Sequence, residues 1–221
     1  VKELYELENE INQMQDNLLK ADEAERVFFQ NASHELRTPL MSISGYAQGI
    51  QRGVFEDVSQ AAGVILDESS RLTEVVDGIL TLTRMDQMRY QVVPVELGIR
   101  EYIEDQIERL EGLAYQKKIK LEFLPGDEHK IISDVMLLGR AFSNVTSNCI
   151  RYAKEMVWIS VEENGEQLKI TIRDDGPGIL EDDLPHLFDR FYKGKNGNHG
   201  LGLSIAKRSM EYMGIIATVN G

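Results

Sequence analysis

A heptad pattern near the start of the chain constrains its fold more than any other feature of the sequence. Apolar residues recur there at alternating spacings of three and four, and mostly Glu, Asn, Gln, Asp and Lys lie between them. A helix with such a seam is stable when another helix covers it. The register slips before the apolar run at Val27, because its continuation would place Glu25 in the seam. We expect a coiled-coil entry helix over residues 1–24, with a seam formed by Leu4, Leu7, Ile11, Met14, Leu18 and Ala21.

A second amphipathic helix is expected from about residue 58 to about residue 89. The stretch Gly53–Asp57 makes the turn before it, so the two helices form a hairpin. One hairpin with so wide an apolar face cannot bury it alone, whereas two copies can, as a dimeric four-helix bundle. We assign residues 25–92 to this all-α domain, although the pattern alone also fits a plain coiled-coil spacer. The apolar face of the second helix consists of Ile65, Leu72, Val75, Ile79 and Leu82.

Charge and cysteine content narrow the classes of partner. The chain has 221 residues, 42% of them hydrophobic, and a formal net charge of -13. It can form a normal core, but it repels nucleic acid and anionic lipid, so we expect no nucleic-acid partner. A protein with a basic surface, or a nucleotide that arrives with a cation, remains compatible. The single cysteine, Cys149, cannot form an internal disulfide and is interpreted as a small core residue.

The pattern changes near Pro94, and residues 93–221 are expected to form a separate α/β sandwich. Segments 157–161 and 168–172 alternate apolar and polar residues on either side of Asn164-Gly165, which is typical of an antiparallel hairpin. Upstream of this hairpin the sequence predicts helices over 97–116 and 134–152, and strands over 119–124 and 131–133.

The segment from Asn31 to Leu40, which reads Asn-Ala-Ser-His-Glu-Leu-Arg-Thr-Pro-Leu, is the first candidate for chemistry. Imidazole attacks phosphorus through Nε2 only when that nitrogen is unprotonated, so Nδ1 carries a proton that needs an acceptor as charge develops. Glu35 lies beside His34 and can accept it. Thr38 shares the helix face of His34, and Pro39 weakens or bends the helix there. The plainer interpretation is a surface histidine on an ordinary helix.

Four further motifs follow in the second half of the chain. Asn144 and Asn148 are four apart on a predicted helix, so their amides share a face, which Arg151 and Tyr152 extend. Each motif alone is common, because paired asparagines are usually solvated or capping and Asp-Asp-Gly is usually a turn. Their order and separations argue against coincidence. The other three are Asp174-Asp175-Gly176-Pro177-Gly178-Ile179, Phe188-Asp189-Arg190-Phe191-Tyr192-Lys193 and Gly200-Leu201-Gly202-Leu203-Ser204.

In this order the motifs resemble the phosphoacceptor box and the asparagine, glycine and phenylalanine boxes of bacterial two-component sensor histidine kinases, which belong to the GHKL superfamily. The resemblance implies a multidomain protein: an all-α helical hairpin that forms a dimeric four-helix bundle, followed by an α/β sandwich ATP-binding domain of the histidine-kinase type. It implies ATP-dependent autophosphorylation of His34 and phosphoryl transfer to an aspartate on the receiver domain of a response regulator. Phosphatase action on that regulator through Thr38 is the expected second activity, and a homodimer is the expected assembly.

The same resemblance assigns roles in binding ATP and Mg2+. Asp174 would accept a hydrogen bond from the adenine amine, and Gly176 and Gly178 would let the backbone approach the ring. Magnesium prefers oxygen ligands, so the amide of Asn148, helped by Asn144, would bind it together with phosphate oxygens. A mobile lid is expected between residues 179 and 200. The other residues expected to bind nucleotide are Arg151 and Tyr152, Arg190 and Lys193 at the outer phosphates, and Gly200, Leu201, Gly202 and Leu203 at a helix start.

Asn144 also distinguishes this chain from other members of the superfamily. Gyrase-like and chaperone ATPases have a glutamate at the matching position, which activates water. An asparagine cannot act as a base, so ATP should survive until His34 attacks its γ-phosphate.

Two departures from the family pattern leave a rival interpretation open. Asn198 stands where the last glycine box commonly opens with glycine, and the family normally adds a closing strand pair beyond the position of Gly221. They favour an ATP-sensing interaction module that has lost kinase activity, whereas the intact Glu35, Asn148 and Asp174 argue against it. The family also implies the cytoplasmic portion of a membrane-anchored sensor protein, with membrane contact only through segments outside this chain.

Overall fold

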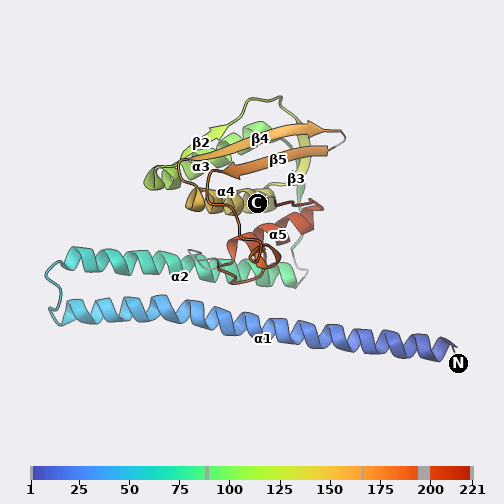
Figure 1. Cartoon of the computed structure of the whole chain (residues 1–221). Coiled ribbons are helices and arrows are strands. Elements are labelled where there is room, and N and C mark those ends of the chain that lie inside the picture. The colour runs from blue at the N-terminus through green and yellow to red at the C-terminus, as the bar shows by residue number, and fades with distance from the viewer. Residues whose placement is uncertain (1, 88–89, 166, 194–199, 220–221) are drawn as a thin grey trace. The chain divides into compact units, whose positions relative to one another are not determined.

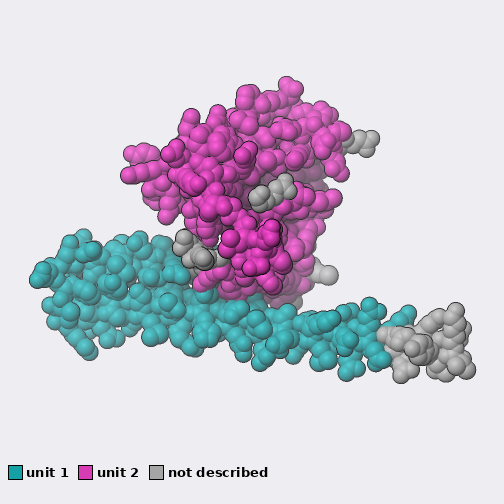
Figure 2. Space-filling model, viewed as in Figure 1, with its two compact units in different colours: residues 1–79 teal, residues 80–221 magenta. Residues whose placement is uncertain are grey.

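The computed structural model describes residues 2–87, 90–165, 167–193 and 200–219, with side chains from Glu10 onward. It separates into two compact units, residues 1–79 and 80–221 (Figure 2). The elements run in the order α1 (Lys2–Gln51), α2 (Val58–Asp86), β1 (Pro94–Gly98), α3 (Ile99–Lys117), β2 (Lys120–Phe123), β3 (Lys130–Asp134), α4 (Val135–Tyr152), β4 (Met156–Asn164), β5 (Gln167–Asp174), the 3-10 helix η1 (Leu184–His186) and α5 (Gly202–Met213).

Unit 1 is a helical hairpin of α1 and most of α2, which confirms the predicted hairpin (Figure 1). α1 stays helical across Pro39, so the missing N–H weakens the ladder of hydrogen bonds without ending the helix. In the turn between the helices Gly53 takes a left-handed φ of 68°, and the rings of Tyr46 and Phe55 stack at 5.3 Å. α2 ends at Asp86, earlier than predicted, and residues 88 and 89 lie outside the described residues.

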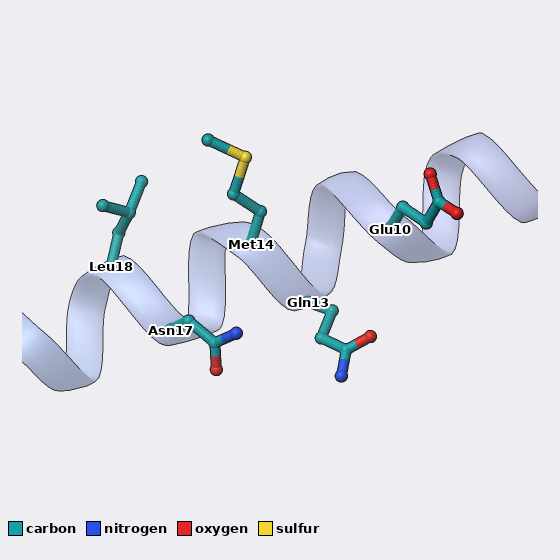
Figure 3. A pocket seen from close by; sticks show the side chains of 5 residues that line it. All are labelled: Glu10, Gln13, Met14, Asn17 and Leu18. Carbon is teal, nitrogen blue, oxygen red and sulfur yellow. The ribbon is translucent and has the colours of Figure 1, made fainter. Parts of the chain in front are cut away.

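The predicted heptad seam forms an exposed apolar strip on α1. Ile11, Met14 and Leu18 keep 56%, 65% and 61% of their surface exposed. Figure 3 shows Met14 and Leu18 on one side of the helix and Gln13 and Asn17 on the other, as the heptad pattern requires. A shallow groove of about 380 Å³ runs over this part of the helix. The side chains of Leu4 and Leu7 lie outside the described part of the chain.

Unit 2 contains the predicted α/β layers, a mixed sheet with helices packed against it. The sheet has the strand order β2-β4-β5, with β2 parallel to β4 and β4 antiparallel to β5. The hairpin between β4 and β5 turns at Gly165, whose φ is 66°. The core lies between this sheet and helices α3 and α4, and its buried members are Ile99, Ile103, Ala114, Ile119, Leu138, Phe142, Cys149, Ile150, Val157, Ile159 and Val161.

The first strand of unit 2 corrects the predicted start of a helix. Leu97 and Gly98 belong to β1, which pairs antiparallel with β3 in a separate two-stranded sheet, and α3 begins only at Ile99. The helical pattern of residues 97–116 predicted helix for the end of this strand. Its pairing with β3 is a long-range contact, which cannot be predicted from the local periodicity of the sequence.

Helix α4 is fixed at its start by an aspartate. The Asp134 carboxylate accepts hydrogen bonds from Met136 N and Leu137 N at 2.9 and 3.0 Å, which satisfies two donors of the first helical turn. The same carboxylate accepts from Val93 N at 2.8 Å. Cys149 is a free, buried thiol on this helix, which confirms its interpretation as a core residue. In the described part of the chain no helix is both long and apolar enough to cross a membrane.

Candidate functional site

The candidate phosphoacceptor lies on an exposed face of α1. His34 and Thr38 are both exposed, one helical turn apart. The Thr38 hydroxyl donates to the backbone carbonyl of His34 at 3.3 Å, and the Ser33 hydroxyl donates to the carbonyl of Phe29 at 2.8 Å. The neighbouring hydroxyls therefore bond to the helix backbone and leave the imidazole accessible to a phosphoryl donor.

The predicted asparagine face lies on α4, within unit 2. Nδ2 of Asn144 donates to the carbonyl of Arg140 at 2.8 Å, so the amide oxygen points away from that carbonyl. A Cβ at Gly202 would lie 2.8 Å from this oxygen, which places the start of α5 directly against Asn144. Asn148 follows one turn later and is half-buried. The structure thus brings two predicted motifs together at Gly202, where a side chain would displace the Asn144 amide.

The glycine loop after β5 meets the other end of α4. Oδ1 of Asp174 accepts from Gly176 N at 2.9 Å, and a Cβ at Gly176 would lie 2.6 Å from the carbonyl oxygen of Tyr152. Gly178 has a φ of 76°, which L side chains rarely adopt. Burial, together with the nearby charge of Asp174, raises the pKa of Cys149 to about 12. The half-buried Asp174 therefore lies between the last turn of α4 and the glycine loop.

The start of α5 suits a phosphate. Leu201 stands at the N-cap and has no side chain that can accept from the first-turn N–H groups. Gly200 has a φ of 66°, is too close to the backbone of Phe191 for any side chain, and accepts from Phe191 N at 2.7 Å. Gly202 and Leu203 begin the helix, so their N–H groups are available to an anion at its positive end.

The two predicted phosphate-binding cations lie in different settings. Nη2 of Arg190 lies 2.7 Å from Oδ1 of Asp86, at the end of α2. Lys193 is exposed, and the residues that follow it, including Asn198, lie outside the described residues. In the described part of the predicted lid, the Tyr192 hydroxyl donates to Oδ1 of Asp183 at 2.6 Å. The structure thus gives Arg190 a carboxylate partner, and the predicted lid is described only up to Lys193.

The amide side chains of Asn144 and Asn148 supply the oxygen donors that a magnesium ion arriving with its nucleotide would require. Mg2+ is usually bound by one or two protein oxygens together with phosphate oxygens and water. Among the described residues there is no group of three or more His, Cys, Asp or Glu side chains that could hold a metal on their own. The amide oxygen of Asn144, which lies against the start of α5, and the amide of Asn148 one turn later on α4 are oxygen donors of the kind that such a shared shell requires.

The prediction of site residues missed Asp175. Its carboxylate accepts from three consecutive backbone N–H groups, those of Lys154, Glu155 and Met156, between α4 and β4. Desolvation raises its pKa, but these hydrogen bonds outweigh it and keep the pKa of Asp175 below its ordinary value. An aspartate beside Gly176 signals a turn, which is why the sequence alone did not mark it as a separate anchor.

Two family models match the chain where these features lie. Residues 24–87 match the His Kinase A (phospho-acceptor) domain, and residues 133–220 match the histidine kinase-, DNA gyrase B-, and HSP90-like ATPase. With both domains present in this order, the chain belongs to the bacterial two-component sensor histidine kinases.

Individual relatives agree with this assignment. The sensor histidine kinase CssS of Bacillus subtilis (strain 168) is 36% identical over 214 residues, which cover 93% of this chain and 46% of CssS. BaeS of Escherichia coli (strain K12), a signal transduction histidine-protein kinase, is 31% identical over 95% of this chain and 46% of its own length. The solved Acinetobacter baumannii histidine kinase AdeS superposes with a TM-score of 0.67 at 26% identity, over 80% of this chain and 86% of that one. The chain thus spans somewhat under half the length of CssS and BaeS.

Proposed function

We propose that this chain is the ATP-dependent autokinase core of a sensor histidine kinase, which phosphorylates His34 and passes the phosphoryl group to an aspartate on a response-regulator receiver domain. One observation carries the proposal: an exposed histidine in the phosphoacceptor segment shares a chain with a site where α4, the glycine loop and α5 converge. We further propose a coiled-coil entry over residues 1–24, a dimerisation and phosphotransfer domain over 25–92 and a catalytic domain over 93–221.

In this proposal unit 2 holds ATP at three points. Asp174 accepts from the adenine amine, and guanine is rejected because its carbonyl would face the carboxylate. The N–H groups at the start of α5 bind phosphate, and Gly202 allows the helix start to approach Asn144. Arg151, Tyr152, Arg190 and Lys193 complete the binding residues; Arg190 would exchange its Asp86 partner for phosphate.

The phosphoacceptor chemistry needs a proton path. His34 attacks the γ-phosphorus through a neutral Nε2, and the N–P bond forms as the bond from phosphorus to the β–γ bridging oxygen breaks and ADP leaves. Nδ1 retains its proton until charge develops on the ring. Glu35 is the adjacent carboxylate that accepts it. Asn144 cannot act as a base toward water, so ATP is preserved until the histidine attacks it.

Magnesium is part of the same proposal. It would be bound by the amide oxygen of Asn148, with Asn144 beside it, and would neutralise charge on the outer phosphates. The Asn144 oxygen lies where the start of α5 meets α4, and Asn148 follows one turn later on α4, which supports this proposal.

The assembly that we propose is a homodimer. The exposed strip of Ile11, Met14 and Leu18 is too apolar for a solvated helix face, and a second copy would cover it in a coiled coil that continues into a four-helix bundle. We expect no nucleic-acid partner, because the net charge is -13. Membrane attachment of the parent protein, through segments outside this chain, stays a prediction.

A second activity follows from Thr38. Dephosphorylation of the regulator requires a water held at phosphorus, and a hydroxyl that both donates and accepts can hold one. In the structure this exposed hydroxyl donates to the His34 carbonyl, so its oxygen can still accept a hydrogen bond from water. Thr38→Ala should keep autokinase activity while labelled regulator decays about 10-fold more slowly in the presence of ADP. Equal decay rates with wild-type and mutant protein would exclude this role.

The test of the autokinase is incubation of the whole chain with γ-labelled ATP and magnesium. We expect protein-bound label that is lost in acid and retained in base, as for a phosphoramidate. The rival function, an ATP-sensing module without kinase activity, predicts ATP binding with no label; Asn198, which departs from the family pattern, is the feature that favours it.

A further inference from the structure

We propose that Asp175 is a positioning residue for adenine recognition, because its carboxylate anchors the glycine loop to the segment that follows α4. This inference rests on the proposed function, in which the neighbouring Asp174 contacts the adenine amine. Asp175 itself would touch neither base nor phosphate, and it would act by holding Asp174 in place.

The anchor consists of four hydrogen bonds to one side chain. Oδ1 of Asp175 accepts from Lys154 N at 2.8 Å, Glu155 N at 3.1 Å and Met156 N at 3.2 Å, and Oδ2 accepts from Glu155 N at 3.1 Å. The backbone N–H of Asp175 in turn donates to the Met156 carbonyl at 3.3 Å. Successive N–H groups that converge on one anion make a concave, positively polarised cradle. The carboxylate therefore joins the end of β5 to the start of β4 at one defined point.

The anchored segment lies next to the end of α4 and to the glycine loop, the two elements that would contact adenine. Lys154 follows Ala153, the C-cap of α4, and the Tyr152 carbonyl in the last turn of this helix already restricts Gly176. Asp174 precedes Asp175 and bonds to Gly176 N, so a shift of the loop moves its carboxylate as well. Recognition of adenine by a carboxylate depends on placement within a fraction of an ångström, since a misplaced acceptor loses its bond to the amine. Loss of the anchor should thus reduce the preference for adenine over guanine, and not only the stability of the fold.

The chain offers a matched control for this reasoning in Glu128. Its carboxylate also accepts from three backbone N–H groups, those of Arg100, Glu101 and His129, at 3.0 to 3.1 Å. None of these three residues belongs to the candidate nucleotide site. Glu128→Ala therefore removes an equivalent set of bonds from a different part of the same unit and reports the purely structural cost.

Two substitutions at Asp175 distinguish the loss of its hydrogen bonds from the loss of its negative charge. An asparagine keeps one acceptor oxygen, which can receive the three bonds now made by Oδ1, whereas an alanine keeps none. Asp175→Asn should hence retain most of the wild-type behaviour, and Asp175→Ala should lose it.

The experiment measures dissociation constants of the whole chain for ATP and for GTP, both with magnesium, for wild type and these three variants. Each is measured at a temperature where the fluorescence of Trp158 shows unit 2 to be folded. We expect the ATP-over-GTP preference to fall about 10-fold in Asp175→Ala and to stay near wild type in Asp175→Asn and Glu128→Ala. A preference in Asp175→Ala equal to that of wild type would overturn the inference while leaving the proposed function intact. Absence of any ATP preference in wild type would instead remove the role of Asp174, and the inference with it.

Discussion

Replacement of Asp134 by alanine should destabilise unit 2 by about 3 kcal/mol. Asp134 is only 3% exposed, and its carboxylate caps α4 through Met136 N and Leu137 N. Loss of an aspartate N-cap costs about 1–2 kcal/mol. Val93 N, bonded at 2.8 Å, also loses its acceptor, which adds about 1 kcal/mol or more. For a unit of this size, 3 kcal/mol corresponds to a fall in melting temperature of roughly 10 °C.

The fluorescence of Trp158 is the direct assay for this change, because it is the only tryptophan of the chain and lies on β4 in unit 2. Asp134→Asn should fall between wild type and Asp134→Ala, since asparagine keeps one oxygen for the helix cap but places an NH2 group where Val93 N requires an acceptor. The exposed Asp105 on α3 is the control, and its replacement by alanine should change stability by no more than about 0.5 kcal/mol. A melting temperature of Asp134→Ala within 2 °C of the control, a bound of roughly half a kcal/mol, would refute the reasoning.

The pH dependence of the stability of Asp134→Ala tests the direction of the pKa shift of Asp134. Desolvation raises the pKa of Asp134, but hydrogen bonds from Val93, Leu137 and Met136 outweigh it and hold the pKa below its ordinary 3.8. A carboxylate whose pKa is lowered in the folded state stabilises the protein fully at pH values above its unfolded-state pKa. This contribution is lost as the pH falls from that value through the lower pKa of the folded state. The difference in stability between wild type and Asp134→Ala should therefore be full at neutral pH and shrink below about pH 4.

Three further predictions concern the metal, the dimer and the thiol. Asn148→Ala should make ATP binding insensitive to magnesium while binding without magnesium changes little, as titration calorimetry would show; retained magnesium dependence would exclude Asn148 as a ligand. Leu18→Asp should yield a monomer by light scattering at micromolar concentration, whereas Asn17→Asp, one position off the seam, should stay dimeric; identical masses would contradict the coiled coil. Cys149, with a pKa of about 12, should react with iodoacetamide at pH 8 at least about 100-fold more slowly in folded than in urea-unfolded protein, by mass spectrometry, and comparable rates would refute its burial.

Local signals in the sequence predicted those parts of the fold that local interactions determine. The hairpin around Gly165 and the helix after Asp134 follow from turn and capping chemistry, which acts over a few residues. Strand β1 was not predicted, because its pairing with β3 joins segments that are far apart in the chain.

In the candidate site, too, residues that belong to sequence motifs were predicted, whereas contacts between distant segments were not. Asn144, Asp174 and Gly202 were predicted from motifs that resemble those of the family, and the structure brings their segments together. The contact between Arg190 and Asp86 joins residues 104 positions apart, and no pattern in either segment predicts it. Asp175 carries no signal beyond that of a turn residue, because its partners are backbone groups that any residue type supplies.

The most direct test of the central claim is the location and stability of phosphate on one tryptic peptide. Cleavage after Arg26 and Arg37 releases residues 27–37, which contain His34 as their only histidine and Ser33 as their only hydroxyl side chain. After incubation with ATP and magnesium we expect this peptide to carry one phosphate that is stable in base and lost in acid, and the His34→Gln protein to yield none. Phosphate on this peptide that survives acid would place the modification on Ser33, and an unmodified peptide from an ATP-binding protein would contradict the autokinase.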